Sequence, residues 1–157
     1  MIKKLVFVSL TCLLFLGFKS PSEKASEKIL KDYWLLDKVT YLEPNMYDKT
    51  ILFNDVTNRC FEQSLWRFSP NSNSGSYAIN DLYCSYGKRE ITFDVTKNTN
   101  KSSLYDVVLN IKNDAGEIGR HKLKIKQLSS KSMQWHYTTQ VNNKPYTIKM
   151  KFVKKTF

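Results

Sequence analysis

The chain reads YDVVLNIKNDAGEIGRHKLKIK from Tyr105 to Lys126, and this segment alternates apolar and polar residues on either side of a turn. Apolar side chains occupy every second position before the turn, at Tyr105, Val107, Leu109 and Ile111. After the turn, Leu123 and Ile125 alternate with lysines. A period of two places successive side chains on opposite faces of a β-strand, and Asn, Asp and Gly are typical turn residues. The segment therefore predicts a β-hairpin with one apolar and one charged face.

The same alternation recurs along most of the chain. Further strands are expected at residues 33–42, 50–53, 60–68, 77–79, 90–95, 133–137 and 146–152. Turn formers separate them, among them Pro44-Asn45 and the run from Ser69 to Gly75. No segment after Leu42 has a helical period, and short connections favour pairing of neighbours in order. We therefore expect an all-β fold, an antiparallel up-and-down barrel of about eight strands that hides its apolar face and its edges. Residues 21–31 are expected to form a short helix or a tether.

The first residues resemble a secretory signal peptide. Lys3 and Lys4 are followed by an apolar run from Leu5 to Phe18, which is shorter than the roughly 20 residues that span a bilayer. Small residues at Ser20 and Ser22 suggest cleavage after residue 22. The expected organisation is a signal peptide at 1–22 and one barrel domain at 23–157, in an exported protein of the periplasm or cell envelope. A lipid anchor on Cys12 is the alternative processing.

Charge and composition limit the classes of partner. The chain has 157 residues with a formal net charge of +11, and three lysines leave with the leader, so the mature chain keeps +8. A basic exported protein meets anionic lipid or glycan more readily than nucleic acid. Lys122, Lys124, Lys126, Lys149 and Lys151 alternate outward on two predicted strands. They are either a solvated face that keeps the barrel soluble or a basic stripe for an anionic lipid or glycan surface.

Two cysteines, Cys60 and Cys84, remain after the leader. An even count in an oxidising compartment predicts one disulfide. A free or metal-binding pair is the alternative, although no CxxC spacing or nearby histidine indicates a metal site.

The sequence carries no recognisable catalytic motif. There is no GxSxG, no HExxH and no glycine-rich phosphate loop among the 5 glycines. The two histidines differ in position: His136 alternates with Trp135 and Tyr137 and is expected to face solvent, whereas His121 follows Arg120 at a strand start. We therefore expect a non-enzyme without cofactor or metal.

Several motifs together resemble the lipocalin-like family of Bacteroidetes envelope proteins. They are Tyr33-Trp34-Leu35-Leu36, the segments 52–56, 60–68 and 70–77, Cys84, Met133 and Phe152-Val153-Lys154. Two positions depart from the wider lipocalin pattern: Asp32 stands where a glycine comes two residues before the tryptophan, and no arginine near the C-terminus clearly matches the one that packs over that tryptophan. The resemblance implies a small up-and-down barrel whose cavity holds an apolar molecule.

Inward aromatic and apolar residues are the candidate ligand contacts. They are Trp34, Trp66, Phe68, Phe93, Tyr105, Trp135, Met150 and Phe152. A barrel of eight strands has room either for side chains or for one small ligand, so the same residues could simply fill the core. The first interpretation predicts an exported lipocalin-like barrel that binds a small hydrophobic ligand. The alternative is a non-catalytic interaction or structural module, with a filled barrel and a basic surface that contacts another envelope component.

Overall fold

The computed structural model describes residues 30–43, 50–100, 102–113, 115–141 and 143–157. The predicted signal peptide, and all but the last two residues of the predicted helix or tether at 21–31, lie outside these ranges. No helix in the described part of the chain is long and apolar enough to span a membrane.

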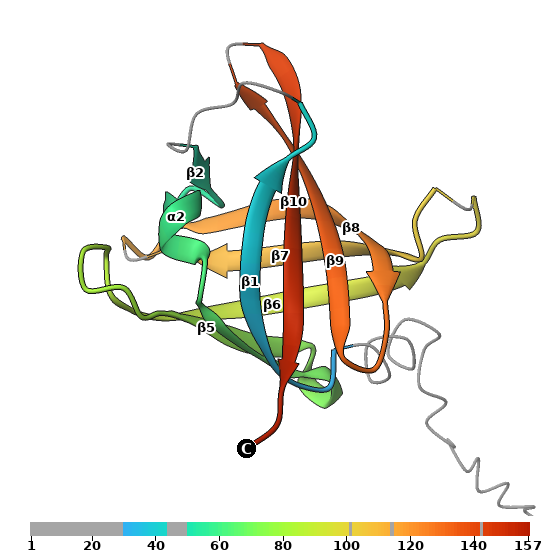
Figure 1. Cartoon of the computed structure of the whole chain (residues 1–157), viewed down its shortest axis with the longest axis horizontal. Helices are drawn as coiled ribbons and strands as arrows, with labels where there is room; N and C mark the ends of the chain where they lie inside the picture. Colours follow the sequence, from blue (N-terminus) through green and yellow to red (C-terminus); the bar gives the residue numbers. More distant parts are fainter. Residues whose placement is uncertain (1–29, 44–49, 101, 114, 142) are drawn as a thin grey trace, which may run out of the picture.

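Eight strands close into an antiparallel barrel, as the alternating pattern predicts (Figure 1). Their order around the barrel is β1-β10-β9-β8-β7-β6-β5-β4. The strands are β1 (Asp32–Tyr41), β4 (Leu65–Ser69), β5 (Ser74–Ile79), β6 (Gly87–Lys97), β7 (Tyr105–Lys112), β8 (Ile118–Leu128), β9 (Ser132–Val141) and β10 (Lys144–Lys155). Each strand from β4 onward pairs with the next one along the chain, so the wall is an up-and-down meander.

The first strand closes the barrel because it pairs on both sides. Tyr33–Tyr41 of β1 pair with Ile148–Lys155 of β10, and Asp32–Leu35 pair with Leu65–Phe68 of β4. The register with β10 shifts between Leu36 and Lys38. An irregularity of this kind bends a strand, which lets β1 follow one neighbour and then leave the other.

Residues 50–64, which we call the lid, contain the small elements between β1 and β4. A two-stranded sheet of β2 (Ile51–Leu52) and β3 (Val56–Thr57) is followed by the short helix α2 (Asn58–Phe61). Figure 1 shows β2 and α2 beside one end of the barrel, which we call the mouth. The 3-10 turn η1 (Pro70–Ser72) lies in the predicted loop between β4 and β5.

The sequence prediction is wrong at the start of one strand, because residues 60–64 belong to the lid. The expected strand at 60–68 begins only at Leu65, because Cys60 and Phe61 belong to α2 and Gln63 has a positive φ of 67°. The Gln63 N–H donates to the carbonyl of Leu36 at 2.7 Å, and the Leu36 N–H donates to Ser64 at 3.0 Å. These bonds join the end of the lid to β1 before the strand proper starts.

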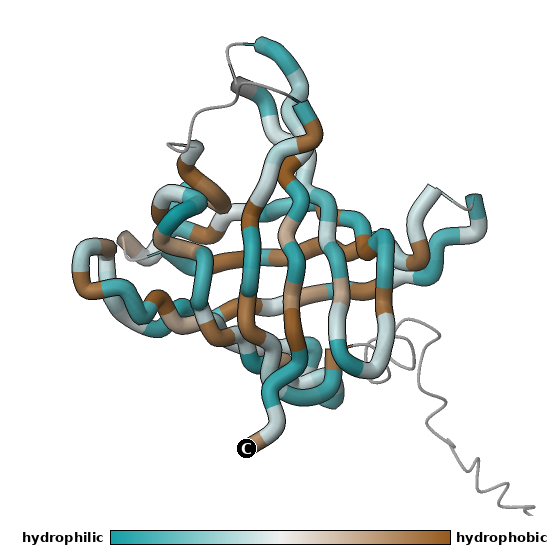
Figure 2. Tube along the Cα trace, viewed as in Figure 1, coloured by the Kyte–Doolittle hydropathy of each residue, from teal (hydrophilic) through white to brown (hydrophobic). Residues whose placement is uncertain are grey.

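The core lies inside the barrel and alternates with polar residues on the outer face. Figure 2 shows brown and teal residues alternating along the strands. On β6, Ile91, Phe93 and Val95 are buried while the residues between them are exposed. Burial of large apolar side chains in this way stabilises the fold by about 1.5–3 kcal/mol each.

The two departures from the lipocalin pattern meet in space. Asp32 has a φ of 91°, a conformation in which glycine is at ease and other residues are strained. Lys154 lies 2.7 Å from the Asp32 carboxylate, and its Nζ is 5.8 Å from the centre of the Trp34 ring. Lys154 therefore lies over the Trp34 ring and also pairs with Asp32.

Candidate functional site

The sequence-predicted ligand contacts all lie inside the barrel. Tyr105 is half-buried, and the others are at most 4% exposed. Trp66 is at the centre of an aromatic cluster, with ring centroids 6.1 Å from Trp135, 5.6 Å from Phe152 and 6.0 Å from Phe68. Phe93 joins through Phe68 at 5.5 Å. The aromatic side chains therefore contact one another, and they fill this part of the interior.

The lid contributes aromatic side chains that the sequence interpretation had not assigned to the interior. Phe53 and Phe61 are 2% and 0% exposed, and their rings are 5.5 Å apart. Phe61 lies 5.2 Å from Tyr77, and Phe53 lies 5.0 Å from Tyr137. The mouth of the barrel is thus closed by side chains from a segment outside the wall.

A backbone turn aims Phe53 into the mouth. Phe53 and Asn54 both have positive φ values, 56° and 57°, in the tight turn between β2 and β3. Asparagine tolerates this conformation, but an aromatic residue adopts it rarely and at a cost. The packing of the Phe53 ring under the lid compensates for this local strain.

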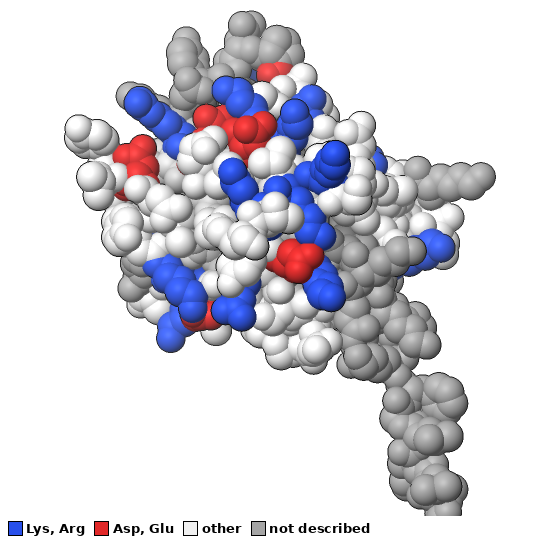
Figure 3. All heavy atoms as spheres, turned by 60° about the horizontal axis from the view of Figure 1, so that its bottom comes forward, with Lys and Arg blue, Asp and Glu red and all other residues white. Residues whose placement is uncertain are grey.

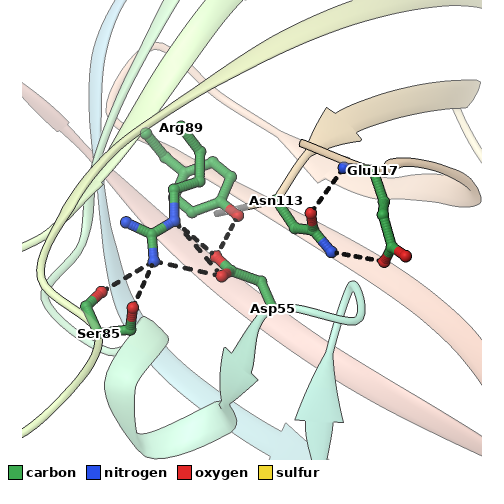
Figure 4. A network of polar contacts seen from close by, with 6 residues as sticks. Asp55, Ser85, Arg89, Asn113 and Glu117 are labelled. Carbon is green, nitrogen blue, oxygen red and sulfur yellow. Dashed lines mark hydrogen bonds and ion pairs between the residues drawn. The ribbon is translucent and has the colours of Figure 1, made fainter. Parts of the chain in front are cut away.

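A buried ion pair anchors the lid to the wall (Figure 4). Asp55 of the lid and Arg89 of β6 are 3% and 1% exposed, and Arg89 Nε lies 3.1 Å from Asp55 Oδ2. The Arg89 guanidinium also donates to the carbonyl of Ser85 at 2.8 Å, and the Tyr77 hydroxyl donates to Asp55 at 2.6 Å. Hydrogen bonds from several donors make a buried carboxylate tolerable.

A disulfide provides the second anchor. Cys60 of α2 is bonded to Cys84 of the β5–β6 connection, which confirms the predicted pair. Ser85, which binds Arg89, is the next residue after Cys84. The covalent and the ionic anchors therefore fasten the lid to the same part of the wall.

His121 lies beneath the lid and was not predicted there. It is 6% exposed, its Nδ1 is 3.1 Å from the Tyr137 hydroxyl, and its ring is 5.1 Å from Phe53. Its Nε2 is buried and has no hydrogen-bond partner. Burial lowers the pKa of the imidazole, because a charged ring would lose its hydration. The sequence held a signal for this position, since His121 shares the parity of inward-facing Leu123 and Ile125.

His136 lies on the outer face, as predicted. It is half-buried there, and its Nε2 is 2.9 Å from Gln134 Nε2. Its pKa is lowered by burial and by the charges of Lys126 and Lys149. No group of three or more histidine, cysteine or acidic residues in the described part of the chain could hold a metal ion.

Comparisons with known proteins add a likeness of fold. No family model and no curated protein matches the chain. Among solved structures, a complex of bovine odorant-binding protein with a selenium-containing odorant matches at 13% identity and a TM-score of 0.47, over 82% of this chain and 74% of that one. The odorant-binding protein from bovine nasal mucosa matches at 13% identity and 0.45, over 90% and 77%. The closed, eight-stranded up-and-down barrel itself is established by the strand pairing of this chain.

Proposed function

We propose that the chain is an exported, lipocalin-like barrel protein of the bacterial cell envelope that binds a small, mostly apolar molecule at its mouth and catalyses no reaction. Export rests on the signal-like sequence of residues 1–22, and the disulfide is consistent with an oxidising compartment. The lipocalin-like motifs support membership of the Bacteroidetes envelope family. Ligand binding rests on the arrangement at the mouth.

The observation that carries ligand binding is the unpartnered Nε2 of His121 beneath Phe53. A buried polar atom without a partner costs about 1–3 kcal/mol. A ligand that took the place of the Phe53 ring and offered one polar group to this nitrogen would recover that cost. Asp55 and Cys60 anchor the lid independently of the Phe53 ring, so displacement of this ring by a ligand would leave both anchors in place. The expected ligand is therefore an apolar molecule with a single hydrogen-bonding group.

Fluorescence of N-phenyl-1-naphthylamine tests this function. Phe53→Ala removes the ring that fills the mouth, so this variant should bind the dye at least about tenfold more tightly than the native protein. Leu104→Ala is the matched control, because Leu104 is 44% exposed and precedes β7 at the end of that strand away from the lid (Figure 1). Phe53→Val serves where the alanine variant does not melt cooperatively. A folded Phe53 variant that binds no more dye than the control would refute ligand binding at the mouth.

The packed aromatic cluster favours a second candidate function. Trp66, Trp135 and Phe152 are 0% exposed and contact one another, so the barrel below the mouth already has a filled core. A filled barrel acts through its surface. In this case the chain would be a non-catalytic module whose basic outer face contacts another component of the envelope.

A further inference from the structure

The outer face of strands β7 to β10 is hollowed into a groove of about 710 Å³. Its lining includes Lys122, Lys124 and Lys126 of β8 and His136 of β9. The volume is within the range of about 300–1,000 Å³ that is usual for ligand sites. We call this feature the outer groove. It is separated from the mouth by the wall itself, because its polar lining residues alternate with the buried residues of the core.

Positive charge converges on the outer groove from two strands. The prediction left open whether the two lysine strands are neighbours, and the structure places β9 between them. Lys124 of β8 lies opposite His136, and His136 lies opposite Lys149 of β10. Neighbouring strands are about 4.8 Å apart, so Lys124 and Lys149 flank the imidazole on both sides. Along β8 the lysines repeat at about 6.7 Å.

Among these cations, Lys124 has a carboxylate as its cross-strand neighbour, Asp106 of β7. The ion pairs of the described residues engage Lys38, Lys88, Arg89 and Lys154. Asp106 is the one carboxylate among the described lining residues of the groove. Its two oxygens already accept hydrogen bonds from Asn98 at 2.9 Å and Ser103 at 3.0 Å. Three lysines line the groove against this one carboxylate, so the groove keeps a net positive charge for an anion.

The pKa of His136 is also affected by the positive charges near the groove. Burial lowers its pKa most, and the charges of Lys126 and Lys149 lower it further. Beside it, the hydroxyls of Thr138 and Thr147 lie 3.2 Å apart and line the same groove. The groove thus combines a row of cations with hydroxyl groups, a set that suits carboxylates and sugar hydroxyls.

We propose that the outer groove binds an acidic polysaccharide, with carboxylates on Lys122 and Lys124 of the lining and on Lys149 beside it, and with sugar hydroxyls near Thr138 and Thr147. Binding to a lipid surface is strengthened by apolar side chains that enter the membrane, and apart from Leu42 in the lining, the exposed large apolar side chains lie outside the groove. Leu82, Tyr83 and Tyr86 of the β5–β6 connection are 85%, 100% and 66% exposed. Figure 3 shows blue Lys and Arg side chains spread over one face with fewer red ones. This inference rests on the second candidate function and is independent of a ligand at the mouth.

Titration calorimetry with oligogalacturonate at low salt tests the proposal. The double variant K124Q/K149Q should bind more than about twofold and up to about 25-fold more weakly, since each of two exposed charge contacts contributes up to about a fivefold effect. K88Q/K97Q changes the net charge equally on β6, outside the groove, and should stay within about twofold of the native protein. Added salt should weaken native binding, because it screens exposed charges.

Three results would overturn the proposal. They are no binding of oligogalacturonate at low salt, an equal loss in both double variants, and tighter binding to phosphatidylglycerol vesicles than to the oligosaccharide. The last result would assign the groove to a lipid surface. Dye binding by Phe53→Ala is unaffected by any of these results, so failure of one function is distinguishable from failure of the other.

Discussion

Replacing Arg89 by methionine is the sharpest test of how the lid is held. Methionine keeps much of the length of the side chain and removes its charge and its donors. Asp55 would then be a carboxylate with 3% of its side chain exposed, without the cation 3.1 Å away. The Tyr77 hydroxyl would still donate to it. The carbonyl of Ser85 would also lose a donor.

The expected loss follows from the burial of this pair. Removing one partner of a buried ion pair costs about 3–5 kcal/mol, because the remaining charge is uncompensated. For a domain of this size, each kcal/mol changes the melting temperature by about 3–4 °C, so the expected fall is roughly 10–20 °C. The neighbouring pair of Lys88 and Glu90 has a shorter distance of 2.7 Å, but its side chains are 63% and 67% exposed. Lys88→Met should therefore cost less than about 1 kcal/mol.

Thermal unfolding followed by circular dichroism compares the two variants directly. They lie on the same strand and remove the same charge, so they differ mainly in burial. A second comparison uses the double variant Asp55→Leu/Arg89→Met, which should be more stable than Arg89→Met alone, because an apolar pair leaves no buried charge. If Arg89→Met melts within about 3 °C of Lys88→Met, the reasoning about the anchor is wrong.

Three further predictions concern other parts of the fold. Removing the Cys60–Cys84 disulfide, which spans a sequence separation of 24, should lower the free energy of unfolding by about 3.5 kcal/mol in urea titrations; an unchanged midpoint under reductant would contradict this. Because the pKa of His121 is lowered in the folded chain, the unfolded chain binds this proton at a higher pH than the folded chain does. Stability should therefore fall as pH decreases below about 6.5, by at most about 1.4 kcal/mol per pH unit, and His121→Phe should reduce that slope in denaturation at several pH values. Asp32→Gly should be more stable than Asp32→Ala by about 1 kcal/mol, because both lose the pair with Lys154 but only glycine relieves the φ of 91°; equal melting temperatures would exclude that strain.

The barrel wall could be predicted because its strands repeat one simple rule. On β7 and β8, inward Val107 and Leu123 lie opposite each other, and the lysines beside Leu123 face outward. Alternation of this kind is local, so it can be recognised in one sequence without knowledge of the fold. Closure followed from the need to cover the apolar face and the edges.

The lid could not be predicted in the same way, because its structure depends on contacts between distant residues. Phe61 reads as part of a strand, yet it ends a short helix and packs against Tyr77. Asp55 reads as a turn residue, and its partner Arg89 is 34 positions away. Neither the positive φ of Phe53 nor the pairing of Asp55 has a local signal. The candidate ligand residues lie inside the barrel, and their role as ligand contacts stays a prediction, while the residues that close the mouth were missed.

The alternation of inward and outward residues that predicts the barrel wall also accounts for the position of His121. His121 lies an even number of residues from inward-facing Leu123 and Ile125, so it faces the interior. A polar side chain there is expected to have a hydrogen-bond partner or a function that explains its burial. On the same strand, one residue further, Lys122 begins the outward row that lines the groove. One strand thus carries an unpartnered nitrogen on its inner face and a row of lysines on its outer face. Because the two sets point to opposite sides of a packed wall, substitutions at the mouth and in the groove should have nearly additive effects on stability, with a coupling below about 0.5 kcal/mol for the pair Phe53→Ala and Lys149→Gln. A larger coupling would mean that the wall transmits changes between the two sites, and the mouth and the groove would then have to be treated as one binding system.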